Sequence, residues 1–162
     1  MLSIRAIRNR GMALFLLAAL SGAAACGSDG ATSPKKTPTP TGTYALRQVD
    51  QKAPPAEIYH GPYFDAANQH FYNQLVVTVT GGGIELDELN HFSFWIDLSY
   101  LGDGVGATKR VSLDGTYELQ GSLVIVHVPN APAAGFTIDS GQIVQAIDLM
   151  GKGDVAQYTF KK

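Results

Sequence analysis

The sequence predicts an all-β domain, a small antiparallel up-and-down β-barrel of about eight to ten strands, with a two-sheet sandwich as the alternative. The first observation is the stretch His91–Leu101, which alternates apolar and polar side chains over its whole length. The second is the recurrence of shorter runs of this kind, separated by turn residues about every 8–12 residues. The third is that nearly all connections are short enough for hairpins. Closing such a sheet into a barrel would remove its exposed edges.

The alternation in His91–Leu101 defines the two faces of one long strand, because successive side chains of a strand point to opposite sides. The apolar side, which should face the core, holds Phe92, Phe94, Ile96, Leu98 and Tyr100. Trp95 falls on the polar side. It is either an isolated exposed aromatic residue, which needs no explanation, or a contact with a partner.

The other strands are expected on both sides of this one. Gly42–Val49 reads as the first strand, and after a turn with two prolines Ala56–Tyr59 reads as a short edge strand. The further expected strands are Gln74–Thr80, Ile84–Leu86, Thr108–Leu119, Leu123–Val128, Phe136–Asp139, Gln142–Leu149 and Val155–Phe160. Gly81–Gly83 is expected to be a turn, and Gly115, which interrupts an apolar series, is expected to mark a bend or bulge.

The segment Tyr59–Tyr72 is unusual, because it holds five of the chain's aromatic residues and two of its histidines. Its glycine and proline would break a regular strand. Asp65 is placed to cap a short helix running to about Leu75, although the next expected strand competes for the same residues. Without that helix, the segment would be a long loop, and such loops often serve as binding segments or as lids.

The first 25 residues predict a secretory signal peptide. Met1–Arg10 carries three arginines and no acid, Met12–Leu20 is apolar, and small residues follow up to Cys26. The apolar run is too short to be a stable membrane-spanning helix, which needs about 20 residues. Cys26 is the only cysteine in the chain, so it cannot form an internal disulfide.

Ser21–Cys26, SGAAAC, resembles the lipobox of bacterial lipoproteins, although Ala23 stands where that family prefers leucine. The resemblance implies cleavage before Cys26 and lipidation of this cysteine, which anchors the protein to a membrane. Several acyl chains, at about 0.8 kcal/mol for each buried CH₂, would make that anchor stable. The alternative is an ordinary signal peptide cleaved at the Ala-x-Ala pattern, which would leave a free thiol.

Residues 26–41 are expected to be the lipidated cysteine and a disordered tether, since proline, threonine, serine and glycine cannot build a core there. Residues 42–162 would then be the folded domain. Gly27, and not aspartate, stands directly after Cys26, and in enterobacterial lipoproteins this implies an outer-membrane location facing the periplasm. Without residues 1–25 the chain has 9 basic and 14 acidic residues, a net charge of −5. Nucleic acid is therefore not an expected partner.

Three segments carry a further resemblance: TGTYALRQVDQKAPPAEI, VSLDGTYELQGSLVIVHV and AQYTFKK. They resemble the small lipocalin-like lipoproteins of bacteria, which join a lipobox and a polar tether to one small β-barrel. The resemblance spans most of Gly42–Lys162 and implies a lipocalin-like barrel. The aromatic segment Tyr59–Tyr72 is not part of that pattern.

No nucleophile elbow, phosphate loop, dinucleotide fingerprint or HExxH motif is present, so we expect neither an enzyme nor a cofactor. The four histidines do not show a metal-ligand spacing. His60, Asp65 and His70 are either polar surface residues or, if they meet, a metal site. His127 either points into the barrel with Leu123 and Ile125 or faces outward.

Two functions follow as hypotheses for this membrane-anchored envelope protein. The first is binding of a small apolar ligand in the barrel, with the aromatic segment as a lid. The ligand-binding residues would be Tyr59, Tyr63, Phe64, Phe71, Tyr72, Phe94, Tyr100, Tyr117 and His127. The second is a packed barrel that acts as an interaction, inhibitor or assembly module by binding an envelope protein, with Trp95 as a contact.

Overall fold

The computed structural model describes residues 40–162, and all of the regular secondary structure in this range is antiparallel β-sheet. The strands are β1 (Gly42–Val49), β2 (Ala56–Asp65), β3 (His70–Leu86), β4 (His91–Gly102), β5 (Val105–Gln120), β6 (Leu123–His127), β7 (Ala134–Thr137), β8 (Gln142–Ile147) and β9 (Ala156–Lys161). The expected signal peptide, Cys26 and nearly all of the expected tether lie outside the described residues. Within residues 40–162, no helix is long and apolar enough to cross a membrane.

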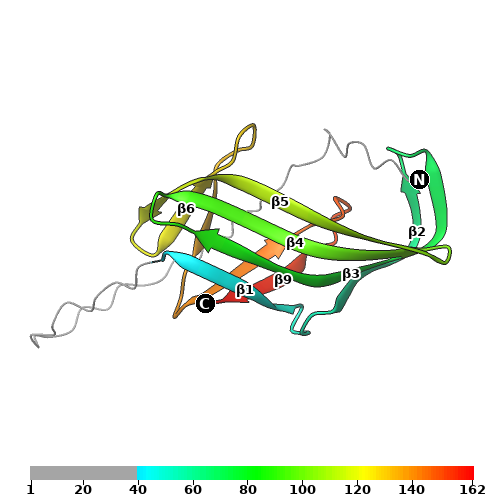
Figure 1. Cartoon of the computed structure of the whole chain (residues 1–162), viewed down its shortest axis with the longest axis horizontal. Coiled ribbons are helices and arrows are strands. Elements are labelled where there is room, and N and C mark those ends of the chain that lie inside the picture. The colour runs from blue at the N-terminus through cyan, green and yellow to red at the C-terminus, as the bar shows by residue number, and fades with distance from the viewer. Residues whose placement is uncertain (1–39) are drawn as a thin grey trace, which may run out of the picture.

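Eight of these strands form a sheet that is nearly closed into a barrel (Figure 1). Neighbouring strands follow the order β7-β6-β5-β4-β3-β1-β9-β8, and β7 and β8 approach each other where the barrel would close. The prediction of an all-β antiparallel barrel is therefore confirmed. The strand β2 lies outside this order, because it pairs with β3 alone.

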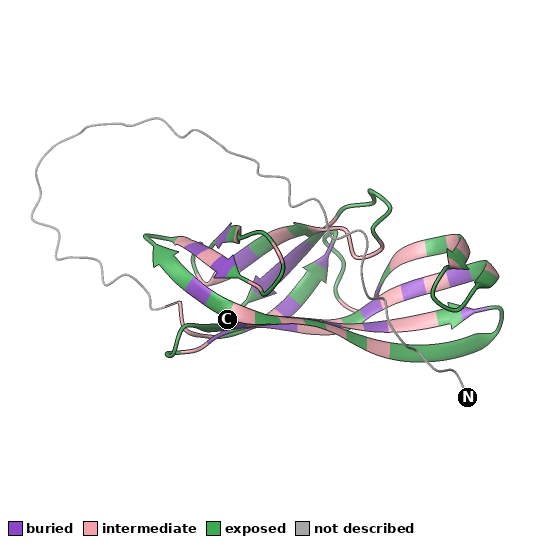
Figure 2. Ribbon diagram, turned by 90° about the horizontal axis from the view of Figure 1, so that it is seen from above, coloured by how far each residue is buried: buried purple, intermediate pink, exposed green. Residues whose placement is uncertain are grey.

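On one side, the same sheet continues beyond the barrel. β3 pairs with β1 only over Gly83–Leu86, whereas its earlier part, His70–Val79, pairs with β2. β5 pairs with β4 along nearly its whole length, but β6 covers only Thr116–Gln120. A four-stranded sheet therefore projects beyond the barrel (Figures 1 and 2). We call it the extension, and define it as β2, residues 70–80 of β3, 97–102 of β4 and 105–110 of β5.

The barrel interior is filled by the large apolar side chains of its own strands. The ring of Phe94 lies 6.2 Å from that of Phe160, and the ring of Phe92 lies 6.3 Å from that of Phe136. The predicted inner face of β4 is confirmed, since Phe92, Phe94, Ile96 and Leu98 are buried and Tyr100 is partly buried. The fully buried side chains include Tyr44, Ile84, Leu86, Ile96, Ile143, Tyr158 and Phe160.

The aromatic segment Tyr59–Tyr72 is a β-hairpin, so the expected helix does not form. The carboxylate of Asp65 accepts hydrogen bonds from the backbone N–H groups of Ala67 and Asn68, at 3.0 and 3.3 Å. These bonds stabilise a short turn, after which the chain returns at once as β3. Phe64 stands opposite Phe71 across this hairpin. Such cross-strand aromatic pairs stabilise a hairpin. The helix was expected from the spacing of residues along the chain, and that spacing contains no information on pairing between strands.

The expected turn at Gly81–Gly83 and the expected bulge at Gly115 are also absent. Gly81–Gly83 is not a turn, because β3 continues through it with a bulge between Val79 and Gly81. Gly83 is required by a close approach, since a Cβ atom there would lie 2.5 Å from Cζ2 of Trp95. Gly115 marks no bulge, because the β4–β5 register is unbroken there. A side chain at Gly115 would collide with the carbonyl oxygen of His127.

We predict that Phe160→Ala lowers the free energy of unfolding by about 3–5 kcal/mol, because it leaves a cavity beside Phe94 in the filled core. Urea unfolding followed by the fluorescence of Trp95, the chain's single tryptophan, would measure this loss. Phe71→Ala is the matched control, since Phe71 is 55% exposed and should cost less than about 1 kcal/mol. Equal losses for the two variants would contradict the filled core.

Candidate functional site

Two of the predicted ligand-binding residues are part of the barrel core. Phe94 is 8% exposed and packs against Phe160, and Tyr117 is 5% exposed. The hydroxyl of Tyr117 donates a hydrogen bond to the carbonyl oxygen of Asp87 at 2.8 Å, and burial raises the pKa of this tyrosine. Its hydroxyl is therefore already engaged in fixing the β3–β4 turn. Both side chains stabilise the barrel in the described structure.

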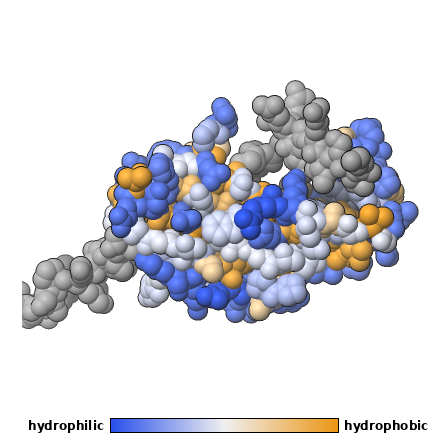
Figure 3. Space-filling model, in the orientation of Figure 1, coloured by the Kyte–Doolittle hydropathy of each residue, from blue (hydrophilic) through white to orange (hydrophobic). Residues whose placement is uncertain are grey.

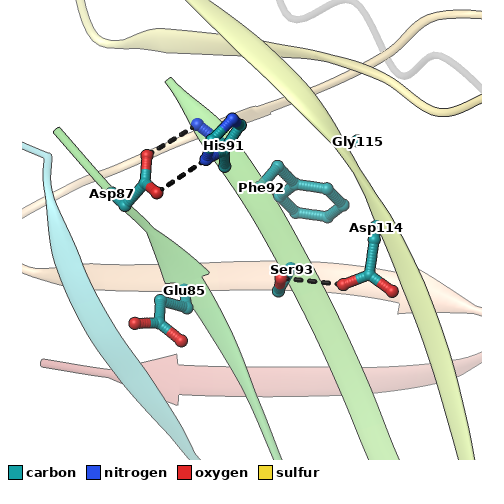
Figure 4. Close-up of a pocket in the computed structure, with 7 residues that line it drawn as sticks. All are labelled: Glu85, Asp87, His91, Phe92, Ser93, Asp114 and Gly115. Carbon is teal, nitrogen blue, oxygen red and sulfur yellow. Dashed lines mark hydrogen bonds and ion pairs between the residues drawn. The ribbon is translucent and has the colours of Figure 1, made fainter. Parts of the chain in front are cut away.

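An open hollow of about 390 Å³ lies where β3, β4 and β5 run side by side, and Figure 4 shows the side chains that line it. The carboxylate of Asp87 accepts hydrogen bonds from the backbone N–H of His91 at 2.7 Å and from its ring Nδ1 at 2.9 Å. The first of these bonds, more than the second, lowers the pKa of Asp87. Ser93 donates to Asp114 at 2.8 Å. Asp87, His91, Ser93 and Asp114 are thus paired with one another and hold the turn and the sheet.

The histidines and acids of the aromatic hairpin do not converge on one point. Asp65 and His70 stand opposite each other, but Nδ1 of His60 lies 3.5 Å from Glu57. Between Pro40 and Lys162, no group of three or more histidine, cysteine, aspartate and glutamate side chains is placed to hold a metal ion. His127 lies on the outer face of the barrel, where its Nε2 is 3.8 Å from Glu118. The outward alternative for this histidine is therefore the one that the structure shows.

The inner face of the extension brings together four of the predicted ligand-binding residues. Tyr63 stands opposite Tyr72, and Val77 lies between Tyr59 and Tyr100 in the strand register. The rings of Tyr59 and Tyr63 meet edge to face at 6.1 Å. Burial, and to a lesser extent the nearby Tyr63, raises the pKa of Tyr100. All four tyrosines are partly buried and pack against the continuous core.

A lysine from the β8–β9 connection fastens this tyrosine cluster to the barrel. The ammonium group of Lys152 lies 4.5 and 4.6 Å from the ring centroids of Tyr59 and Tyr63, and it donates a hydrogen bond to the Tyr59 hydroxyl at 3.1 Å. Both ring contacts are within cation–π range. Sequence reasoning missed Lys152, because it lies 93 residues from Tyr59, between two expected strands, and belongs to no motif.

The carboxylate of Asp148 shapes the loop that carries Lys152. It accepts backbone N–H groups from Met150, Gly151, Lys152 and Gly153 at 2.7–3.3 Å. Burial alone would raise the pKa of Asp148, but these donors outweigh it and hold the pKa below its ordinary value. The position of Lys152 is therefore set by its own loop rather than by the tyrosines alone.

The outer face of the extension carries exposed apolar side chains. Phe64 and Phe71 are 52% and 55% exposed, and Leu101 of β4 is 52% exposed. Val76 stands opposite Leu101, next to the inner-face pair of Val77 and Tyr100. The pair of Phe64 and Phe71 likewise lies next to the pair of Tyr63 and Tyr72, so both pairs point away from the tyrosines. Figure 3 shows hydrophobic surface at this end of the molecule. Phe64 and Phe71, which were predicted to bind a ligand with the tyrosines, thus lie on the opposite face from them.

Trp95 lies on the outer face of the barrel, as the alternation predicted. Its ring rests against Gly83, and the guanidinium of Arg110 lies 5.9 Å from the ring centroid. Arg110 is held by two hydrogen bonds to Asp97, at 2.7 and 2.9 Å, which lower the pKa of this aspartate. Trp95 is half-buried in this arrangement.

No family model, curated protein or solved structure matches this chain. The lipobox and the lipocalin-like identity therefore stay predictions.

We predict that Gly83→Ala pushes the indole ring of Trp95 off the sheet and into water, because the added methyl group would overlap the ring. The fluorescence emission of this single tryptophan should shift to longer wavelength. Ser112→Ala is the matched control, since Ser112 stands opposite Trp95 on the other neighbouring strand. An unchanged emission spectrum for Gly83→Ala would contradict the placement of the ring.

Proposed function

We propose that the protein is a non-enzymatic interaction module of the bacterial cell envelope, anchored through Cys26, that binds another envelope protein with the outer face of its extension. The observation that carries this proposal is the contrast between a filled barrel and an apolar outer face. The large side chains of the barrel core are buried, whereas Phe64, Phe71 and Leu101 are about half exposed.

The position of these side chains on one face supports a protein partner. Single exposed apolar residues are common, but several on one face are typical of an interaction site. Aromatic side chains are enriched at such interfaces, where they supply much of the binding energy. The outer face presents two phenylalanines directly opposite each other, with Val76 and Leu101 further along the same sheet.

The extension is also held in place before any partner arrives. Its strands β3, β4 and β5 are continuous with barrel strands, and Lys152 holds Tyr59 from the barrel side. The carboxylate of Asp103 accepts the backbone N–H groups of Asn73 and Gln74 at 3.4 and 3.3 Å, which ties the β4–β5 turn to β3. A preorganised surface loses less conformational entropy on binding.

A second candidate function is binding of a small apolar ligand, as the sequence suggested. The observation that favours it is the gathering of Tyr59, Tyr63, Tyr72 and Tyr100 on the inner face of the extension. Such a ligand would lie between these rings and Lys152 rather than inside the barrel, whose interior is filled by its own side chains.

The lipid anchor has a direct test. When the full chain is expressed in a bacterium that processes lipoproteins, it should sediment with the membrane fraction, and Cys26→Ser should release it into the soluble periplasmic fraction. Mass spectrometry of the mature N-terminus would identify the acyl chains on Cys26. A free thiol at Cys26 together with an unchanged distribution would contradict lipidation.

The interaction face can be tested by photo-crosslinking in cells. A photoreactive phenylalanine analogue at Phe71 should form one defined protein adduct, and Phe64→Ser in the same chain should reduce that adduct at least about fivefold. The matched control carries the same analogue at Val144, which is an exposed apolar position on the barrel strand β8 (41% exposed).

Equal adducts at Phe71 and Val144, or none at Phe71, would contradict the proposed function. A native mass spectrum of the purified chain then decides on the second candidate. An additional small mass that is lost in Tyr100→Ala would assign the inner face of the extension to a ligand.

A further inference from the structure

The extension has two free edges, and they differ in regularity. The outer edge of β2 contains Gly61 and Pro62, and its pairing with β3 shifts register twice. Proline and bulges keep an edge from accepting another strand. The edge of β5 from Val105 to Gly115 has no proline, and its pairing with β4 runs through twelve residue pairs without a shift. Among the described strands, β6 covers only the part from Thr116 onward.

The strand register identifies the backbone groups that point outward from this edge. The N–H of Tyr117 donates to the carbonyl oxygen of Asn90 at 2.9 Å, so odd-numbered residues of β5 face β4. The even-numbered residues therefore turn their N–H and C=O groups toward the free edge. These residues are Gly106, Thr108, Arg110, Ser112 and Asp114. Thr116 continues this series and stands opposite His127 of β6, as the alternation requires.

We propose that this edge of β5 pairs with the same edge of a second copy of the chain, antiparallel about a two-fold axis at Thr108. Antiparallel self-pairing about a two-fold axis forms a closed dimer, and the irregular edge of β2 would stop further growth. The two extensions would then form one eight-stranded sheet.

The side chains of β5 limit how far along the strand the axis can lie. An axis at Lys109 or Arg110 would place that cation directly opposite its own copy, which is destabilising. An axis further along would bring the second copy against Gly115, where the backbone of His127 and Val128 already lies. With the axis at Thr108, residues 104–112 of the two copies overlap and both obstacles are avoided.

In this register, the side chains that would face each other are also compatible in size and charge. Val105, which is 63% exposed, would stand opposite Val111 of the second copy, so both become covered. Lys109 would stand opposite Ala107, and Arg110 opposite Gly106, so neither cation meets a large side chain. The two copies of Lys109 remain diagonal neighbours on one face. Since salt screens their repulsion, the dimer should become tighter as ionic strength rises.

The proposal can be tested by sedimentation of the secreted chain. This chain carries Cys26→Ser, because that substitution removes association through acyl chains. The chain should be dimeric at micromolar concentration, and Thr108→Pro should make it monomeric. Proline at this position removes an N–H that faces the free edge. It does not remove a hydrogen bond to β4. Thr108→Val keeps that N–H and should stay dimeric. The emission of Trp95 should be the same in all three proteins, which shows that each is folded.

Disulfide formation tests the register itself, because Cys26→Ser leaves no other cysteine. Val105→Cys combined with Val111→Cys should oxidise to a covalent dimer. Each single variant should stay uncrosslinked, since its two cysteines would be about 20 Å apart, six residues along the strand. If the chain with the unchanged β5 edge stays monomeric at micromolar concentration, as expected if another protein supplies the strand, the proposal is overturned. A Thr108→Pro protein that stays dimeric would also overturn it.

Discussion

The structure depends on the pairing between β3 and β4, which runs from Leu75 to Leu86 on one strand and from Phe92 to Gly102 on the other. One half of this ladder belongs to the barrel and the other half to the extension. Its inner side chains are buried in both halves, for example Ile84 in the barrel and Val77 in the extension. A single apolar core therefore runs from one part into the other. The extension is stabilised by this shared core, because its inner side chains are buried together with those of the barrel.

The sequence predicted the fold class and most of the strands, because alternation is a local signal. β1 and β4 lie within one residue of their expected bounds, and the inner face of β4 is as expected. The errors concern residues whose role is set by a distant contact. In the sequence Gly83 resembles a turn residue, and Gly115 resembles a bulge residue. In the structure Gly83 is needed because Trp95 lies against it, and Gly115 because the backbone of His127 lies close to it. Both glycines serve sheet packing, which a single stretch of sequence cannot show.

The candidate sites were harder to predict for the same reason. Tyr59 to Tyr72 was recognisable as unusual, but a loop, a helix and a hairpin would each group its aromatic side chains differently. The hairpin separates Phe64 and Phe71 from the tyrosines and places them on the other face. Lys152 carried no signal at all, because its role requires Asp148 to shape the loop and the barrel to bring that loop to Tyr59. The pairing of strands and the burial of side chains determine where these residues lie, and neither can be read from a single stretch of sequence.

The division between barrel and extension also bears on how such a domain could evolve a function. A filled barrel offers little room for change, since each inner side chain contacts several others and substitution there costs stability. The outer face of the extension and the edge of β5 carry mostly exposed residues, so their chemistry can change without loss of the core. The tyrosines, the exposed phenylalanines and the edge of β5 are three separate surfaces on one small sheet. Since they do not overlap, a strand added at the edge would leave both faces open to other partners.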